Sequence, residues 1–415
     1  MPIWRPYTSH YDGAPIPPMI VRAQGSYLYA QDGRTFWDGV SAWWVTVHGH
    51  CHPYIAEAIA RQAHTIEQVL FADFTHPAAE WVADELGRLT GLPWAFFSDD
   101  GSTAVEVALK VAIQYFRNRG ETRRSILALE GAYHGDTFGA MSVSARSPFT
   151  AAFDEYLFSV EWLPFPSPEN HEHLETTLRS LSQRKDIAAF IGEPLLQGTA
   201  GMRTFSAHYW DAIVRVVRST GAIIIADEVF TGFGRTGTLF ATQQCEEKPD
   251  ILCLSKGLTG GFLPMGLTMV SEKIFSAFHS PQKEKALYHG HSYTGNALSA
   301  AAAAANLELW QRAETLEKLR ILTKKQEELA NQWKGLHPSI PARHLGLVLA
   351  IELPSGEKGY FAPHRTALKA FGMERGVYLR PLGNVAYTLP ALSSEPTELE
   401  RALEVIEEYV KKSLP

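Results

Sequence analysis

The sequence predicts an α/β protein, in which a large domain with a mostly parallel sheet covered by helices is joined to a smaller α+β domain. Two observations support this prediction. The middle of the chain alternates short apolar runs with helical patterns, as is typical of parallel sheets buried on both faces. The length of 415 residues also exceeds what one compact core usually holds, so a second domain is expected.

Five apolar runs predict the strands of the large domain. The first run precedes a stretch at 102–116 whose apolar residues recur at helical spacing. Thr103-Ala-Val-Glu106 fits a capping box for that helix. Another amphipathic helix is expected at 209–217, before the fourth run. The predicted strands cover 94–97, 126–129, 188–191, 222–226 and 251–254.

The pattern of apolar and charged residues changes after about residue 310. Charged helical patterns and strand-like runs follow one another there, at 314–333, 345–352, 377–380 and 397–411. The strand-like run at 26–29 indicates that the first forty or so residues join the same part of the fold. We therefore predict an N-terminal segment of the small domain, a large domain and a C-terminal small domain, at 1–45, 46–305 and 306–415.

Charge and composition exclude several classes of partner. The net charge of −7 argues against nucleic acid. No apolar run is long enough to span a bilayer, and no secretory signal pattern is visible. Three cysteines do not make a disulfide framework, so a cytoplasmic protein with reduced thiols is expected. The histidine clusters at 48–52 and 289–291 lack the spacing of common zinc sites, so no metal is predicted.

Polar residues follow each of the five apolar runs. In an open parallel sheet, ligands bind outside the carboxyl ends of the strands, so these residues are expected to share one edge. This arrangement predicts an active site there. The residues that follow the runs include Gly101-Ser102, Tyr133-His134, Glu193, Asp227-Glu228 and Ser255-Lys256.

The same edge offers each group that pyridoxal phosphate (PLP) requires. Lys256 could hold the cofactor covalently, and Asp227 could pair with its protonated ring nitrogen. The helix start at Gly101-Ser102 could bind the phosphate, and Tyr133 could stack on the ring. Taken singly, these residues could instead be a solvated lysine, a capping aspartate, a ligand-free helix start and a core tyrosine. The complete set favours the cofactor site.

Four motifs resemble the class III, or ω-, aminotransferases of PLP fold type I. The resemblance extends over essentially the whole chain. It implies a sheet of the seven-stranded type, PLP as cofactor and aminotransferase activity. The family's usual Gly-Asn-Pro reads Gly-Asn-Ala here, which is a departure from the pattern. The motifs cover 192–194, 226–237, 254–257 and 295–296.

The resemblance also implies roles for individual residues. Lys256 would carry PLP as a Schiff base. Ser292 stands where the family usually has a threonine that binds the phosphate of the neighbouring subunit, which implies a homodimer with shared active sites. The residues implied at the cofactor are Gly101, Ser102, Tyr133, His134, Glu193, Asp227, Lys256 and Ser292.

One branch of the family fits best, on motifs at 6–9, 41–44, 131–142 and 377–383. Its members transfer an amino group from S-adenosylmethionine to 8-amino-7-oxononanoate, giving 7,8-diaminononanoate in biotin biosynthesis. Trp43 and Trp44 could line an apolar slot, and Arg380 could bind the distal carboxylate of the acceptor. Tyr7, Trp43 and Asp136 could face the sulfonium of the donor. The implied substrate residues are Tyr7, Trp43, Trp44, Tyr133, Asp136, Arg235, Lys256, Gly290, Arg380 and Tyr387.

Other functions are compatible with the same residues. A different ω-aminotransferase could use lysine, ornithine or 4-aminobutyrate as donor. A PLP aminomutase or racemase could use the same core, but it would need no second keto substrate. A degenerate, non-catalytic fold is a further alternative, against which the intact Lys256 and Asp227 argue. The tryptophan pair could serve packing, and Arg380 could form a structural ion pair.

Overall fold

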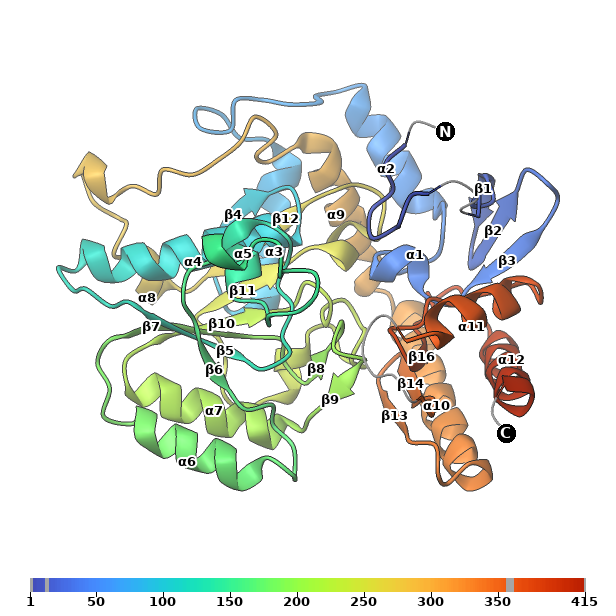
Figure 1. Cartoon of the computed structure of the whole chain (residues 1–415). Coiled ribbons are helices and arrows are strands. Elements are labelled where there is room, and N and C mark those ends of the chain that lie inside the picture. Colours follow the sequence, from blue (N-terminus) through green and yellow to red (C-terminus); the bar gives the residue numbers. More distant parts are fainter. Residues whose placement is uncertain (1–2, 12–14, 356–361, 414–415) are drawn as a thin grey trace.

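A seven-stranded sheet forms the centre of the larger part of the molecule, which is drawn on the left in Figure 1. The computed structural model describes residues 3–11, 15–355 and 362–413. Strand β12 is antiparallel to both of its neighbours, and all other pairs are parallel, so the mostly parallel sheet is confirmed. In spatial order the strands are β4 (Trp94–Ser98), β12 (Gly266–Val270), β11 (Ile251–Leu254), β10 (Ile223–Asp227), β7 (Ile187–Gly192), β5 (Ser125–Leu129) and β6 (Glu161–Leu163).

All five predicted strands of the sheet are present, whereas β6 and β12 were not predicted. The sheet is buried on both faces because alternate side chains enter different cores. In β10, Ile224 packs into one core, while Ile223 and Ile225 pack into the other. The helices of this part are α2 (Pro53–Ala63), α3 (Pro77–Thr90), α4 (Gly101–Asn118), α5 (Phe138–Ser142), α6 (His171–Leu181), α7 (Ala207–Ser219), α8 (Glu272–Phe275) and α9 (Ala297–Trp310).

The remaining strands belong mainly to the smaller part, on the right in Figure 1. There β15 pairs in parallel with β3, so an N-terminal and a C-terminal strand share one sheet. The domain limits stay a prediction, and residues 1 and 415 lie outside the described residues. The elements are β1 (Ile20–Gln24), β2 (Tyr27–Ala30), β3 (Thr35–Asp38), β13 (Ala342–Leu345), β14 (Val348–Glu352), β15 (Val377–Tyr378), β16 (Val385–Thr388), α10 (Ala313–Leu336), α11 (His364–Met373) and α12 (Pro396–Ser413), with the short pair β8 (Leu196–Gln197) and β9 (Arg203–Thr204) in the larger part.

Two local predictions were wrong. The run at 345–352 is not one strand, because the chain turns at Gly346 between β13 and β14. Gly346 has a φ of +57°, and a Cβ there would lie 2.2 Å from the carbonyl carbon of Thr236. The capping box of α4 also lies earlier than predicted, since Asp100 caps the helix together with Thr103. Glu106 instead accepts hydrogen bonds from Thr137, Gly139 and Ala140, at the start of α5.

The short element α1 (Ser41–Trp44) is left-handed. Its four residues have φ values of +49°, +61°, +118° and +72°, although none is glycine. Each L-residue in a left-handed helical conformation costs roughly 1–2 kcal/mol, so the surrounding structure has to hold this turn in place. The turn contains both tryptophans of the predicted substrate slot.

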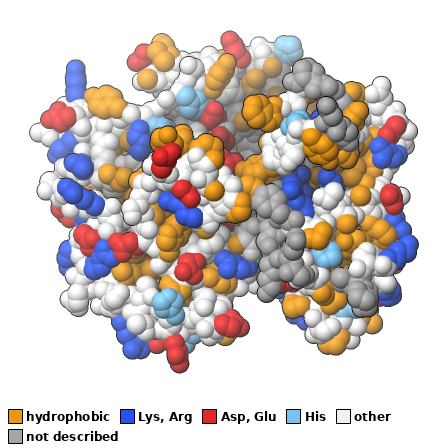
Figure 2. All heavy atoms as spheres, viewed as in Figure 1, with side chains coloured by type: hydrophobic (Ala, Val, Ile, Leu, Met, Phe, Trp, Pro, Cys, Tyr) orange, Lys and Arg blue, Asp and Glu red, His pale blue; other side chains and the backbone are white. Residues whose placement is uncertain are grey.

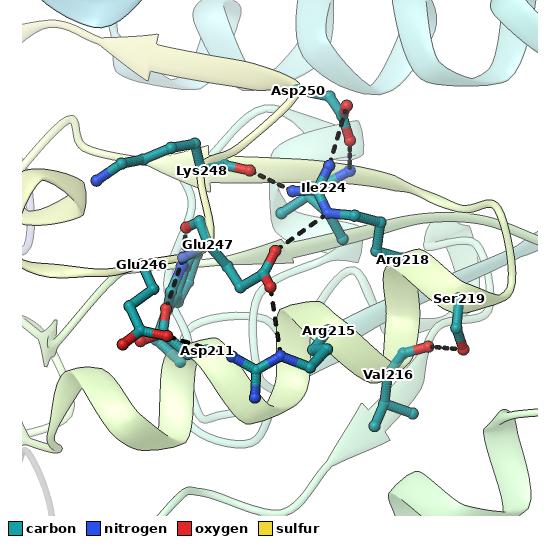
Figure 3. Close-up of polar contacts among 11 residues, drawn as sticks. Asp211, Arg215, Val216, Arg218, Ser219, Ile224, Glu246, Glu247, Lys248 and Asp250 are labelled. Carbon is teal, nitrogen blue, oxygen red and sulfur yellow. Dashed lines mark hydrogen bonds and ion pairs between the residues drawn. The ribbon is translucent and has the colours of Figure 1, made fainter.

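A buried carboxylate joins α7 to the sheet, within the ionic cluster drawn in Figure 3. Asp250 accepts a hydrogen bond from the N–H of Ile224 at 2.9 Å and pairs with Arg218 at 3.5 Å. Arg218 also pairs with Glu247. These contacts fix the starts of β10 and β11, the two strands that end at Asp227 and just before Lys256.

We expect Asp250→Ala to destabilise the protein by about 1–3 kcal/mol, because it leaves the buried N–H of Ile224 without an acceptor. Glu246→Ala is the matched control. Glu246 pairs with Arg215 in the same cluster but is 84% exposed, so its loss should change stability by less than about 1 kcal/mol. Thermal unfolding midpoints of the two variants at equal cofactor occupancy give the comparison. Equal destabilisation by both would contradict this account of Asp250.

The charge distribution on the surface and the composition of the helices are relevant to the predicted absence of nucleic-acid and membrane partners. Figure 2 shows acidic and basic side chains interspersed over the visible face. Within the described residues, no helix combines the length and apolar character needed to cross a bilayer.

Candidate active site

A cavity of about 480 Å³ lies at the carboxyl ends of the sheet strands. The β-strands deliver its polar residues as predicted, because β10, β11 and β4 run in one direction and end at the same edge. The structure thus brings together eight of the predicted site residues. They are Trp44, Gly101, Ser102, Tyr133, His134, Glu193, Asp227 and Lys256.

Asp227 ends β10 and is almost completely buried. Its Oδ2 accepts a hydrogen bond from Nδ1 of His134 at 2.6 Å, and its Oδ1 accepts one from the N–H of Val229 at 3.0 Å. Because a carboxylate only accepts, Nδ1 of His134 carries the proton. The Nε2 of His134 is buried and has no hydrogen-bond partner among the described residues. The side chain of Asp227 is therefore held in one orientation in the cavity wall.

Lys256 lies two residues after the end of β11 and has a left-handed backbone, with a φ of +43°. Its Nζ lies 5.1 Å from the ring centre of Trp44 and 5.8 Å from that of Phe230. Burial lowers the pKa of the Lys256 amine, and the charges of Asp227 and Glu193 oppose that effect. A lysine whose neutral form is favoured in this way is suited to nucleophilic and proton-transfer chemistry.

The N-terminus of α4 borders the same cavity. The N–H groups of Gly101 and Ser102 have no acceptor among the described residues, as is normal for the first turn of a helix. Ser102 Oγ accepts a hydrogen bond from the N–H of Asp136 at 3.2 Å. This close approach requires Gly135, where a Cβ would lie 2.1 Å from that Oγ. The free donors and the helix dipole form a site for a phosphate group.

Glu193 connects two loops beneath the cavity. Its Oε2 accepts a hydrogen bond from the N–H of Tyr133 at 3.2 Å, and its Oε1 accepts one from the N–H of Gly198 at 3.0 Å. Burial raises the pKa of Glu193 to about 7, with a further contribution from the charge of Asp227 and an opposing one from His134. Glu193 therefore fixes the backbone that presents the Tyr133 ring.

A group of aromatic and charged side chains continues from Tyr133 away from the lysine. The hydroxyl of Tyr7 lies 3.4 Å from that of Tyr133 and donates a hydrogen bond to Asp136. The rings of Tyr7 and Trp43 meet edge to face at 5.5 Å. Arg380 places its Cζ 4.5 Å from the ring centre of Trp43. The structure thus brings together five residues predicted for the substrates, namely Tyr7, Trp43, Tyr133, Asp136 and Arg380.

Other predicted substrate residues lie elsewhere. Arg235 is buried and does not line the cavity, since its guanidinium donates hydrogen bonds to the carbonyls of Trp44 and Thr46 at 3.1 and 2.9 Å. Tyr387 is also buried and accepts a hydrogen bond from Nε1 of Trp44 at 2.9 Å. Arg235 and Tyr387 thus hold Trp44 in place through hydrogen bonds. Gly290 and Ser292 lie in an exposed loop and do not line this cavity.

Sequence reasoning missed several residues of the site. Phe230 packs against Trp44 with ring centres 4.5 Å apart and faces Lys256. Val229 lines the cavity and packs where a Cβ on Gly101 would lie, 2.6 Å from its Cγ1. Both follow Asp227 within three residues, so their place after the strand was the signal that could have identified them.

The residues present fit PLP. The cavity offers a lysine of lowered pKa, an oriented carboxylate, an aromatic ring and free N–H donors at a helix start. Among the described residues, no group of three or more His, Cys, Asp or Glu side chains is placed to hold a metal ion.

Comparison with known proteins agrees with this site. The model of the family "Aminotransferase class-III" matches residues 8–410. An adenosylmethionine-8-amino-7-oxononanoate aminotransferase from Synechococcus elongatus is 46% identical, with 96% of each chain covered. The one from Helicobacter pylori is 36% identical, with 99% of this chain and 97% of the relative covered.

Solved structures agree as well. The crystal structure of the Methanocaldococcus jannaschii enzyme of the same name has a TM-score of 0.93 and 32% identity, covering 100% of this chain and 97% of that one. A PLP-bound amine transaminase from an uncultivated Pseudomonas species has a TM-score of 0.89 and 28% identity, with 98% of each chain covered. The predicted PLP fold type I is thereby confirmed. The chain belongs to the class-III aminotransferases, which are PLP-dependent enzymes.

Proposed function

We propose that this aminotransferase transfers the amino group of S-adenosylmethionine to 8-amino-7-oxononanoate, giving 7,8-diaminononanoate in biotin biosynthesis. The observation that carries the proposal is the contact of Arg380 with Trp43, which continues a line of contacts from the cavity-lining Tyr133. An acceptor with an apolar chain and a distal carboxylate matches an aromatic wall that ends in a guanidinium. The names of the relatives from Synechococcus elongatus and Helicobacter pylori support the same substrates.

The residues of the cavity have distinct tasks in this reaction. Bound PLP withdraws electrons from the bond that breaks at the substrate carbon. Asp227, oriented by His134, would hold the positive ring nitrogen, and the N–H groups of Gly101 and Ser102 would hold the phosphate. Lys256 would attach the cofactor and move a proton at the reacting carbon, and the lowering of its pKa by burial favours both tasks.

The exposed carboxylate of Asp136 favours a cationic donor. It accepts a hydrogen bond from Tyr7, and burial together with the charge of Asp136 raises the pKa of Tyr133, so the Tyr133 hydroxyl remains neutral. An anion beside two aromatic rings suits a sulfonium cation. Lysine also carries a cation, so the amino donor has to be established by experiment.

A coupled assay of 8-amino-7-oxononanoate with a panel of donors tests the function. We expect product with S-adenosylmethionine and little with lysine, ornithine or 4-aminobutyrate. Product formation only with another donor would support a different ω-aminotransferase. Isomerisation of a single substrate without a keto acceptor would instead support a mutase or racemase.

We also propose a homodimer in which each subunit completes the partner's site. Four large apolar side chains are exposed on two segments, one around residues 68–74 and the other around residues 288–294. The two segments are in contact, because the side-chain amide of Gln68 donates a hydrogen bond to the carbonyl of Thr294 at 3.2 Å. Exposed large apolar side chains on adjoining segments are typical of a protein interface. Ser292 lies on the second segment, where the family resemblance places a phosphate contact to the neighbouring subunit. The exposed side chains are Leu70, Phe74, Tyr288 and Tyr293.

We expect the protein to sediment as a dimer, and Tyr293→Asp to shift it toward monomer with a parallel loss of activity. A buried charge at an interface is costly, whereas Leu336→Asp, at an exposed position on α10, should leave the dimer intact. Sedimentation velocity and activity over a dilution series measure both effects. A monomeric parent protein with full activity would overturn the proposal.

A further inference from the structure

We propose that Asp38 is a positioning residue for substrate specificity, because its carboxylate holds the left-handed turn α1 that carries Trp43 and Trp44. This inference rests on the proposed function, since it concerns the surface that receives the keto acid. Asp38 ends β3, is buried, and does not line the catalytic cavity.

Both oxygens of Asp38 serve the turn. Oδ1 accepts a hydrogen bond from the N–H of Val40 at 3.2 Å, and Oδ2 accepts one from the N–H of Ala42 at 2.6 Å. Oδ2 also lies 2.9 Å from Nε2 of His50. The N–H of Ala42 belongs to the left-handed turn, whereas Val40 precedes the turn with a φ of −131°. By receiving both N–H groups, the Asp38 carboxylate ties the turn to the residue before it and offsets part of the unfavourable conformation.

Further contacts hold the other end of the turn. Ser41 Oγ donates to the carbonyl of Leu389 at 2.6 Å, and Arg235 donates to the carbonyl of Trp44. Arg235 is buried, and burial lowers the pKa of its guanidinium to about 10. The charge of Asp38 opposes this effect and raises the pKa of Arg235. The two buried and opposite charges thus enclose the turn from both ends.

The turn determines where the two indole rings lie. Trp44 faces Lys256 and Phe230, while Trp43 faces Tyr7 and Arg380. The segment that follows the turn packs tightly on the loop after Lys256, since a Cβ on Gly261 in that loop would lie 2.9 Å from backbone atoms of Thr46. A right-handed or extended backbone at 41–44 would redirect both rings. Asp38 thereby acts on the substrate through the tryptophans and not by touching it.

The test is Asp38→Asn, alone and combined with Ala42→Gly, in the PLP-loaded enzyme. Asparagine can accept from one N–H but presents an NH₂ group to another donor, so the turn should relax. Glycine adopts positive φ without steric cost, and Ala42 is exposed with a φ of +61°. Glycine at position 42 should therefore restore the turn without the carboxylate.

We expect Asp38→Asn to lower kcat/KM for 8-amino-7-oxononanoate about 10- to 100-fold, mainly through KM, with the cofactor absorbance unchanged. The double variant should recover at least half of the loss on a logarithmic scale. Parental kcat/KM in Asp38→Asn, loss of the cofactor from it, or failure of Ala42→Gly to restore activity would each overturn the inference.

Two further outcomes are distinguishable. If Asp38→Asn does not fold, the double variant becomes the test, and the inference stands only if it regains folding and activity. If the parent enzyme does not use 8-amino-7-oxononanoate, the proposed function fails, and the same comparison with the acceptor it does use decides the role of Asp38.

Discussion

Lys256→Ala is expected to abolish turnover, with a loss of at least about 10³-fold, because one side chain provides both the covalent attachment and the proton transfer. The place of Lys256 in the structure explains the size of the effect. Its Nζ lies beside the packed rings of Trp44 and Phe230, in a cavity that is also lined by Asp227. Borohydride reduction of the loaded enzyme, followed by peptide mapping, should find the cofactor on Lys256 in the parent and on no lysine in the variant.

The matched control is Lys324→Ala on α10, where the side chain is 67% exposed. It should keep parental activity and the same labelled peptide. If borohydride fixed PLP at another lysine of Lys256→Ala, with turnover intact, the assignment of Lys256 would be refuted.

Arg380→Ala and Asp136→Asn are expected to impair different halves of the reaction. Arg380 lies over Trp43, where it could bind the carboxylate of the keto acid. Losing a bidentate charged pair costs roughly 2–4 kcal/mol, which is a ~30- to 1000-fold fall in specificity constant. Asp136 faces Tyr7 instead, so its neutralisation should weaken the cationic donor more than the anionic acceptor.

The two half-reactions can be followed separately, because the aldehyde and amine forms of the cofactor absorb differently. Arg380→Lys is the control for the first variant: it retains the charge but loses the planar fork, so its loss should be intermediate. Equal impairment of both half-reactions by Arg380→Ala and Asp136→Asn would contradict this division of roles. The assignment of Lys256 would be unaffected.

Local sequence patterns predicted the cofactor edge because it depends on strand direction. Once five apolar strands run parallel, the residues that follow them must meet, and Asp227 and Lys256 do line one cavity. Strand β12 escaped prediction since an antiparallel return within a parallel sheet has no distinctive local pattern. Gly266 and the following apolar residues look like any buried strand or helix start.

Features that depend on long-range contacts could not be predicted. Arg235 belongs to a motif with a strong family resemblance, yet its guanidinium is directed at the carbonyls of Trp44 and Thr46, far away in sequence. The left-handed turn at Ser41–Trp44 contains no glycine, so nothing local marks it. Its conformation depends on the nearby Asp38 and on Leu389, which is distant in sequence and approaches the turn only in the folded chain. The role predicted for Ser292, which lies in an exposed loop, involves a second chain, so that role stays a prediction.

The strand order has a consequence for how the enzyme is made in the cell. Strand β4 lies at one edge of the sheet, and its sole sheet neighbour is β12, which the ribosome synthesises much later. Until Val270 has emerged, β4, which leads into α4, has no partner strand in the sheet. A nascent chain therefore carries an unpaired apolar strand, the kind of edge that invites aggregation and chaperone binding. Capture of the cofactor is accordingly a late event, which follows synthesis of Lys256 and the return strand behind it.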